Sequence, residues 1–129
     1  MKEIEEIRSY CLNCKNSQCR IKGCPLGNCI PDFIHEVDSK KAYEILCNTT
    51  VLPAICGRIC PHEKQCEGSC IRGIKGEPVS IGTMEAYIGD LSIENNYELS
   101  IEVDERAKDK SVAVIGSGPA GLTCAAFLA

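Results

Sequence analysis

The chain has 129 residues, a formal net charge of −4, 44% hydrophobic residues and eleven cysteines. The acidic balance, without a block of lysine and arginine, argues against a nucleic-acid-binding protein. No apolar run approaches the length of a membrane span, and the charged N-terminus does not have the form of a signal peptide. We therefore expect a cytoplasmic protein with no membrane partner.

Ten of the eleven cysteines lie between Cys11 and Cys70. The first cysteine segment is Cys11-x2-Cys14-x4-Cys19-x4-Cys24-Pro25, and the second is Cys56-x3-Cys60-x5-Cys66-x3-Cys70. A disulfide framework is typical of secreted domains, whose cysteines usually come in even numbers behind a signal peptide. In a reducing cytosol, this density of cysteines indicates metal or cluster binding instead. Metal-binding energy would then supply much of the folding energy.

The first half of the chain alternates predicted helices with cysteine-rich loops. Apolar spacing and capping residues predict helices over residues 3–10, over residues 31–37, and from a cap at Asp38–Ser39 to Cys47. The first cysteine segment, rich in Asn, Gly and Pro, is predicted to be irregular. Residues 48–53 are expected to connect to the second cysteine segment.

A longer helix is predicted from Ile81 to about Ile93, with Ser80 as its N-cap. Its apolar stripe consists of Ile81, Met84, Ile88 and Leu91. Glu85 lies one residue beside this stripe. The polar residues 96–110 that follow are expected to be a linker.

The last residues change character and predict a strand, a glycine turn and a helix. Val112–Ile115 is β-branched and apolar, Gly116-Ser-Gly118-Pro119-Ala120-Gly121 has the G-x-G-x-x-G form, and an apolar run follows. In this context the motif indicates a dinucleotide-binding turn. Gly116 would allow the tight turn, Gly118 the approach of a pyrophosphate, and Gly121 close packing of helix on strand. The helix N-terminus would face the phosphates.

The chain ends at Ala129, before the acidic residue that would bind the ribose about 20 positions after such a motif. We therefore expect a fragment of a longer protein that continues into a flavin-binding domain. This stub alone is not expected to bind a dinucleotide.

Two kinds of metal site suit the cysteine segments. Zinc sites favour paired C-x2-C motifs, and only Cys11 and Cys14 have that spacing. A cysteine before proline, as at Cys24-Pro25, is typical of two-cluster ferredoxins, where that cysteine binds the other cluster. Two [4Fe–4S] clusters are therefore favoured over two zinc ions. Each segment could bind its own cluster, or Cys24 could reach across; the spacing leaves both partitions open.

The remaining candidate residues have ordinary structural interpretations. Cys29, Cys47 and Cys124 lack partners at ligand spacing and are expected to be small buried apolar residues. His62, after Cys60-Pro61, is expected at a loop surface or as a hydrogen-bond donor near a cluster.

Three runs resemble the N-terminal domain of the small (β) subunit of glutamate synthase: Cys11 to Phe33, Leu52 to Pro61 and Gln65 to Cys70. They are also similar to the large subunit of NADH-dependent ferredoxin:NADP oxidoreductase and to the N-terminal domain of dihydropyrimidine dehydrogenase. The run Val114 to Leu122 resembles the FAD fingerprint that follows in all three families. The resemblance extends from about Tyr10 to the last residue.

The resemblance implies crossed ligation of two [4Fe–4S] clusters. One cluster would be bound by Cys11, Cys14, Cys19 and Cys70. The other would be bound by Cys24, Cys60, Cys66 and, at a position where relatives carry Gln or Glu, Glu85. Cys56 would then lie beside the second cluster or have a structural role. From the residues alone, Glu85 is more simply a solvated carboxylate.

The resemblance also implies a mainly α fold: a small helical iron–sulfur domain over residues 1–95, a linker over 96–110, and an incomplete Rossmann-type FAD/NAD(P)-binding domain over 111–129. Such a domain passes electrons between a flavin in an NAD(P)H-oxidising module and a partner redox subunit. FAD and NAD(P)H belong to the longer parent only, and no catalytic residue is assigned. Glutamate formation, electron bifurcation and pyrimidine reduction all use this module. The alternative is a zinc-stabilised interaction domain without a redox role.

Overall fold

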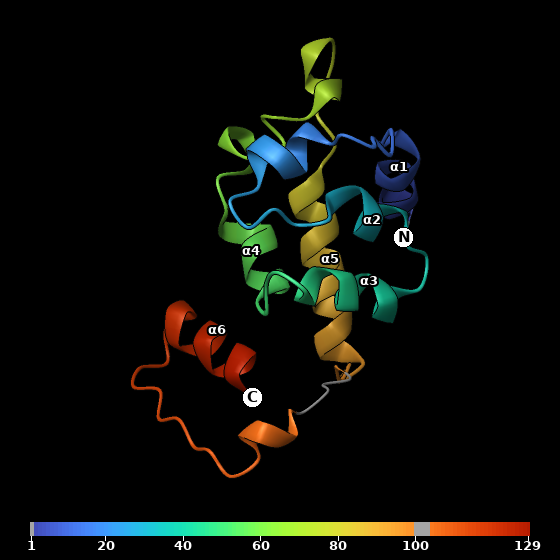
Figure 1. Ribbon diagram of the computed structural model, residues 1–129. Coiled ribbons are helices and arrows are strands. Elements are labelled where there is room, and N and C mark those ends of the chain that lie inside the picture. Colours follow the sequence, from blue (N-terminus) through green and yellow to red (C-terminus); the bar gives the residue numbers. More distant parts are fainter. Residues whose placement is uncertain (1, 100–103) are drawn as a thin grey trace. The chain divides into compact units, whose positions relative to one another are not determined.

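The computed structural model describes residues 2–99 and 104–129 (Figure 1). The chain divides into two compact units, Met1–Tyr97 and Glu98–Ala129. Within the described residues both units contain helices and no strand. The expected mainly α fold is therefore confirmed.

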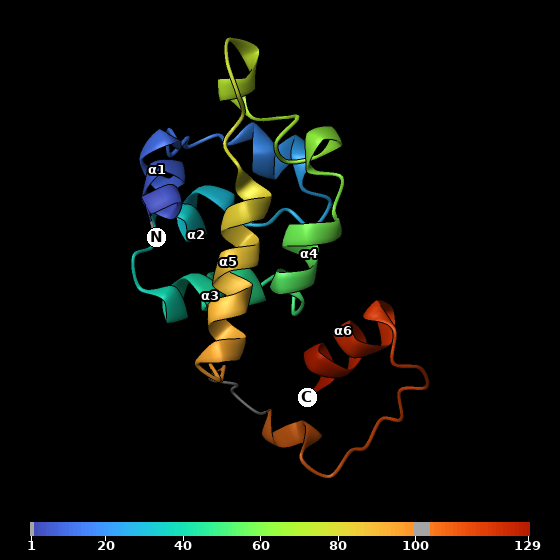
Figure 2. The ribbon, with the colours of Figure 1, turned by 180° about the vertical axis from the view of Figure 1, so that it is seen from behind.

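The first unit is built around one central helix. It contains α1 (Lys2–Tyr10), α2 (Ile30–His35), α3 (Ser39–Cys47), α4 (Pro53–Ile59) and α5 (Ile81–Glu94). Figures 1 and 2 show α5 running through the middle of this unit, and α5 contacts each of the other four helices, α4 most extensively. Shorter turns lie between them: a π turn at Cys19–Gly23 and 3-10 turns at His62–Lys64 and Ile71–Ile74.

The buried side chains of this unit form one core. Phe33, Ile34, Leu46 and Met84 are completely buried, and the predicted stripe supplies Ile81 and Ile88 as well. Burial of such a side chain contributes about 1.5–3 kcal/mol relative to its exposure to water. Cys66 belongs to this core, and Cys11, Cys19, Cys24 and Cys70 pack against it half-buried. The thiols therefore border the hydrophobic interior.

Helices α4 and α5 touch through their backbones. A Cβ atom added at Gly57 would lie 2.7 Å from the Gly82 carbonyl oxygen, and one added at Gly89 would lie 2.6 Å from Ala54 Cα. Neither contact leaves room for a side chain. The second cysteine segment is consequently held directly against α5. Helix α4 was not among the predicted elements.

The two predicted caps have different outcomes. Asp38 caps α3 as expected, since its side chain accepts hydrogen bonds from the backbone N–H groups of Lys40 (2.9 Å) and Lys41 (3.1 Å). Ser80 is the N-cap residue of α5, as predicted, but its side chain makes no capping hydrogen bond. The Glu67 carboxylate accepts from the Gly82 N–H instead, at 3.0 Å. This bond ties the second cysteine segment to the first turn of α5.

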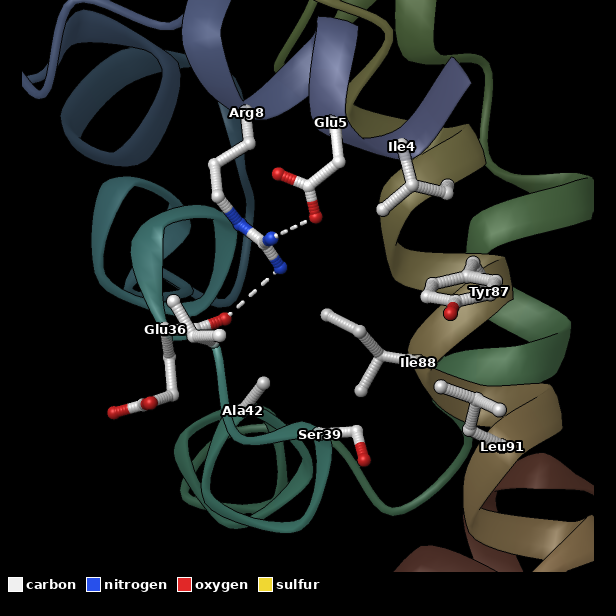
Figure 3. Close-up of a pocket in the computed structure, with 10 residues that line it drawn as sticks. Ile4, Glu5, Arg8, Glu36, Ser39, Ala42, Tyr87, Ile88 and Leu91 are labelled. Atoms are coloured by element: carbon white, nitrogen blue, oxygen red, sulfur yellow. Dashed lines mark hydrogen bonds and ion pairs between the residues drawn. The ribbon is translucent and has the colours of Figure 1, made fainter. Parts of the chain in front are cut away.

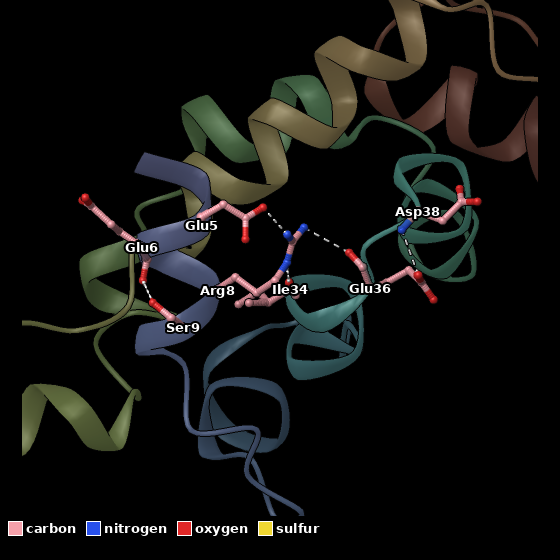
Figure 4. Close-up of polar contacts among 7 residues, drawn as sticks. All are labelled: Glu5, Glu6, Arg8, Ser9, Ile34, Glu36 and Asp38. Carbon is pink, nitrogen blue, oxygen red and sulfur yellow. Dashed lines mark hydrogen bonds and ion pairs between the residues drawn. The ribbon is translucent and has the colours of Figure 1, made fainter. Parts of the chain in front are cut away.

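Arg8 joins α1 to the end of α2 (Figure 4). Its side chain pairs with Glu5 at 2.6 Å and donates to the carbonyl oxygens of Ile34 (2.9 Å) and Glu36 (3.2 Å). These carbonyls lie where a helix end leaves acceptors unsatisfied. Arg8 also lines a pocket of about 430 Å³ between α1, α3 and α5 (Figure 3). No cysteine lines this pocket, so it is separate from the candidate metal centre.

The second unit forms only part of the predicted strand–turn–helix. Helix α6 (Pro119–Leu128) begins after the glycine turn, where Gly116 adopts a φ of +110° that favours glycine. Residues 112–115 do not form the predicted strand, which corrects the expectation of a Rossmann-type stub. A strand needs a neighbour to take up its N–H and C=O groups, and no other described residue pairs with this segment.

Helix length can also be compared with the thickness of a bilayer. Among the described residues, none of the helices is both long and apolar enough to cross a membrane.

Candidate metal centre

All eleven cysteines lie within the described residues and none forms a disulfide. Four of them line one pocket: Cys11, Cys14 and Cys19 from the first cysteine segment, and Cys70 from the second. We call these four the first thiol set. The remaining lining is apolar apart from Ser17 and Arg72, and consists of Leu12, Ile30, Pro31, Ile34, Ile71, Val79 and Ile81. Cys24 does not line this pocket.

The thiols of the first set interact electrostatically with one another. Burial, with smaller contributions from the neighbouring thiols of Cys70, Cys11 and Cys14, raises the pKa of Cys19 to about 11. Burial also raises the pKa of Cys11, with added contributions from Cys14 and Cys70. Several thiolates in one apolar pocket repel each other and are poorly solvated. A cationic centre that binds them would remove both penalties.

Cys24, Cys60 and Cys66 form a second thiol set. Burial raises the pKa of Cys60 to about 11, and Cys56, Glu85 and Cys24 contribute as neighbours. Burial raises the pKa of Cys66 to about 12, with Glu67, Glu85 and Cys24 as further causes. Both thiols therefore lie near Cys24, which comes from the other cysteine segment.

Gly23 explains how Cys24 reaches the second cysteine segment. A Cβ atom at this position would lie 2.7 Å from Cys66 Cα and 2.8 Å from the Gln65 carbonyl oxygen. The two segments thus touch through their backbones at the residue before Cys24. The π turn Cys19–Gly23 ends here, with the Cys24 N–H donating to the Cys19 carbonyl at 2.8 Å.

Glu85 lies beside the second thiol set and is only 7% exposed. Burial raises the pKa of this carboxyl to about 7. Glu85 is therefore not the solvated carboxylate that the residues alone suggest. Within residues 2–99 and 104–129 its side chain makes no hydrogen bond that would offset the cost of burial. A buried carboxylate without a partner is unfavourable unless it is protonated or bound to a cation.

Cys56 also adjoins this set. The Cys56 thiol is a neighbour that raises the pKa of Cys60, and the Thr50 hydroxyl lies 3.5 Å from Cys56 Sγ. Both Cys56 and Glu85 are therefore neighbours of Cys60.

The two donor sets can be compared with the ligands that a single metal ion or a cluster needs. In the described part of the chain, no three His, Cys, Asp or Glu side chains are grouped so that they could hold one metal ion. A [4Fe–4S] cluster is held by four separate ligands, one to each iron, and thiolate is its usual ligand. The first set offers four thiols, and the second offers three thiols with Glu85 or Cys56 adjacent.

Other expectations for single residues have mixed outcomes. Cys47 is buried as expected, Cys29 is half-buried, and Cys124 is exposed rather than buried. The ring of His62 lies against Gly82, and its buried Nε2 has no hydrogen-bond partner among the described residues. Arg72 in the first pocket is a residue that the sequence analysis missed; the available signal was a cation two positions after Cys70.

The glycine turn belongs to the second unit. Gly118 is the N-cap residue of α6, Pro119 and Ala120 are its first residues, and Gly121 packs against the Gly116 carbonyl. The turn is therefore formed, while its residues remain mostly exposed to solvent.

Comparison with known proteins adds independent information. The family described as dihydropyrimidine dehydrogenase domain II, 4Fe-4S cluster, matches residues 2–97. The small chain of NADPH glutamate synthase from Escherichia coli is 38% identical, with 92% of this chain and 25% of that protein covered.

Two further relatives extend the comparison. A protein named UacF from E. coli is 45% identical over 82% of this chain and 17% of its own length. NADH glutamate synthase from Saccharomyces cerevisiae is 38% identical over 98% of this chain and 6% of its own length. The chain thus spans about a quarter or less of these relatives. Because the family match covers almost the whole first unit, the chain belongs to the family of the dihydropyrimidine dehydrogenase domain II that carries a 4Fe-4S cluster.

Proposed function

We propose that the first unit carries two [4Fe–4S] clusters with crossed ligation. The first thiol set would bind one cluster, and the second thiol set together with Glu85 would bind the other. Family membership supports the cluster type, and the count of two rests on the two separate donor sets.

One observation carries the crossed assignment: Cys70 shares an apolar pocket with Cys11, Cys14 and Cys19, whereas Cys24 lies near Cys60 and Cys66. A local partition, in which each cysteine segment binds its own cluster, would require Cys24 and Cys70 to exchange places.

The protein's own residues would bind and shield the clusters. The thiols would be deprotonated as they bind, and the apolar lining of the first pocket would keep water away from the centre. Glu85 would supply an oxygen ligand where the family resemblance implies one, which leaves Cys56 as a neighbour of the cluster. Such clusters, when bound, accept and donate single electrons at potentials that their surroundings set.

We further propose that these electrons pass between an FAD- and NAD(P)H-binding module and the redox centre of a partner subunit. The names of two relatives, NADPH and NADH glutamate synthase, support this role. In a longer protein, Gly116, Gly118, Pro119, Ala120 and Gly121 would bind the FAD pyrophosphate at the start of α6. A reducing compartment such as the cytoplasm suits such thiolate sites.

Metal and sulfide analysis of anaerobically prepared protein tests this function. Two clusters require about eight irons and eight acid-labile sulfides per chain, with a broad visible absorption that dithionite bleaches. A colourless protein that contains zinc in place of iron would instead support an interaction domain without a redox role. To exclude loss of clusters to oxygen, the same analysis follows reconstitution with iron and sulfide.

A further inference from the structure

Arg72 places a positive charge at the first thiol set. It follows Cys70 by two residues, in the 3-10 turn Ile71–Ile74, and its half-buried side chain lines the same pocket as the four thiols. Its charge acts on the Cys11 thiol in the direction that favours the thiolate, against the effects of burial and of the neighbouring thiols. The cation is therefore close enough to affect charge within the pocket.

The guanidinium of Arg72 is fixed by Tyr10. Arg72 Nε donates to the Tyr10 carbonyl oxygen at 2.9 Å, and Arg72 Cζ lies 4.3 Å from the centre of the Tyr10 ring. This stacking is a cation–π interaction. The Tyr10 hydroxyl in turn donates to the Glu77 carbonyl oxygen at 3.0 Å, which holds the far edge of the ring. The charge is consequently held in place rather than on a freely moving side chain.

No carboxylate of the described residues forms an ion pair with Arg72. Glu3, Glu6 and Glu77 line a neighbouring pocket with Arg72. Among residues 2–99 and 104–129, however, no carboxylate oxygen lies within the 4.0 Å of Arg72 that an ion pair requires. Lys75, in the same loop, shares an open groove with Arg72 and adds positive charge.

The second thiol set has neighbours of the opposite sign. The Glu85 and Glu67 carboxyl groups both act on Cys66, and Glu85 also acts on Cys60. Reduction of a cluster adds one negative charge. A fixed cation therefore favours the reduced form, and a carboxylate favours the oxidised form.

We propose that Arg72 raises the reduction potential of the cluster bound by the first thiol set above that of the cluster bound by the second. This inference rests on the proposed function, and it makes Arg72 a tuning residue rather than a ligand. An electron shared between the two clusters would then reside mainly on the one beside Arg72.

Potentiometric titration monitored by electron paramagnetic resonance tests this inference. The complete protein, loaded with clusters, is reduced stepwise through mediators, one electron per cluster. Arg72→Gln is expected to lower the midpoint of one signal and to leave the other unchanged, whereas Arg72→Lys should retain most of the wild-type value. Lys75→Gln is the matched control, since it removes an exposed charge from the same loop, and only a small shift is expected.

The shifted signal is assigned with Glu85→Ala, which should alter the other signal. The inference is overturned if Arg72→Gln moves neither midpoint, moves both equally, or acts on the signal that Glu85→Ala changes. If the Arg72→Gln protein does not bind the first cluster, Tyr10→Leu decides, because it removes the ring that stacks on the guanidinium and keeps the charge of Arg72. A lowered midpoint then supports the proposal, and an unchanged one contradicts it.

Different results would contradict the proposed function and the proposed role of Arg72. A protein with fewer than two clusters contradicts the proposed function. A protein with two intact clusters whose midpoints do not respond to Arg72 contradicts only the role of Arg72.

Discussion

The two thiol sets use the same ligand chemistry in different surroundings. The first set lies around an apolar pocket with Arg72 at its wall, and no helix is shared among its four thiols. The second set lies against α5, near the α4–α5 contact, and faces Glu85. The two centres of this small domain therefore differ in the charge of the residues around the cysteines, while the cysteine ligands themselves are alike.

Removal of iron and sulfide should have the largest effect, because it would destabilise the fold around both thiol sets alike. Thiols from both sets border the core, and Cys66 belongs to it, so binding energy is coupled to folding. We expect chelation under anaerobic conditions to remove the cooperative thermal unfolding transition, measured by circular dichroism. An iron-free protein that unfolds with an unchanged midpoint would contradict this coupling.

Gly57→Ala should affect the second set alone. The added methyl group would clash with Gly82 and Ala86 on α5 and separate α4 from Glu85. Overpacking of this kind costs about 1–3 kcal/mol, which denaturant unfolding can measure. The resonance signal of the second cluster should broaden or disappear while that of the first persists.

Gly73→Ala is the control for this change, because its added Cβ would approach no atom closer than 3.6 Å. Equal damage to both signals by Gly57→Ala would show that the two sets are not structurally separate.

Glu85→Ala should change the redox properties of the second cluster with a smaller effect on the fold. Loss of a hard, negatively charged ligand should raise the midpoint of that cluster, measured by potentiometry. Glu85→Gln, which keeps an amide oxygen at the same position, should retain the cluster. If Glu85→Ala leaves both clusters unchanged while Cys56→Ser destroys one, Cys56 is the ligand and Glu85 is not.

Asp38→Ala should have the smallest effect and leave both sets intact. Loss of the two hydrogen bonds to the start of α3 should cost about 0.5–2 kcal/mol of unfolding free energy. Both resonance signals should retain their wild-type positions. Lys40→Ala is the control, because it preserves the backbone N–H that Asp38 caps; a shifted cluster signal in Asp38→Ala would link α3 to the thiol sets.

Three of the helices could be predicted from features that are local in the sequence. The apolar spacing of α1, α3 and α5 and the Asp38 cap are local features, and the structure has them at nearly the expected bounds. Helix α4 was missed, because its seven residues begin with Pro53 and include Gly57, and both residue types often mark turns. The strand over 112–115 was predicted from its β-branched residues, but strand pairing depends on a partner segment.

The assignment of ligands to the two clusters could not be predicted from the spacing of the cysteines alone. Spacing indicated clusters over zinc but left two partitions open, because chain order does not specify which loops touch. The contact at Gly23 and the burial of Glu85 are tertiary features. Arg72 and Glu67 were assigned no role from the sequence, and only their contacts with Tyr10 and Gly82 place them beside the thiols.

Single replacement of Cys24 tests the central claim of crossed ligation most directly. Anaerobic Cys24→Ser protein is compared by electron paramagnetic resonance with Cys11→Ser and Cys66→Ser, each expected to retain about four irons in one intact cluster. Crossed ligation predicts that Cys24→Ser loses the same signal as Cys66→Ser and keeps the signal that Cys11→Ser loses. Loss of the Cys11-dependent signal in Cys24→Ser would contradict the account and assign each cysteine segment its own cluster.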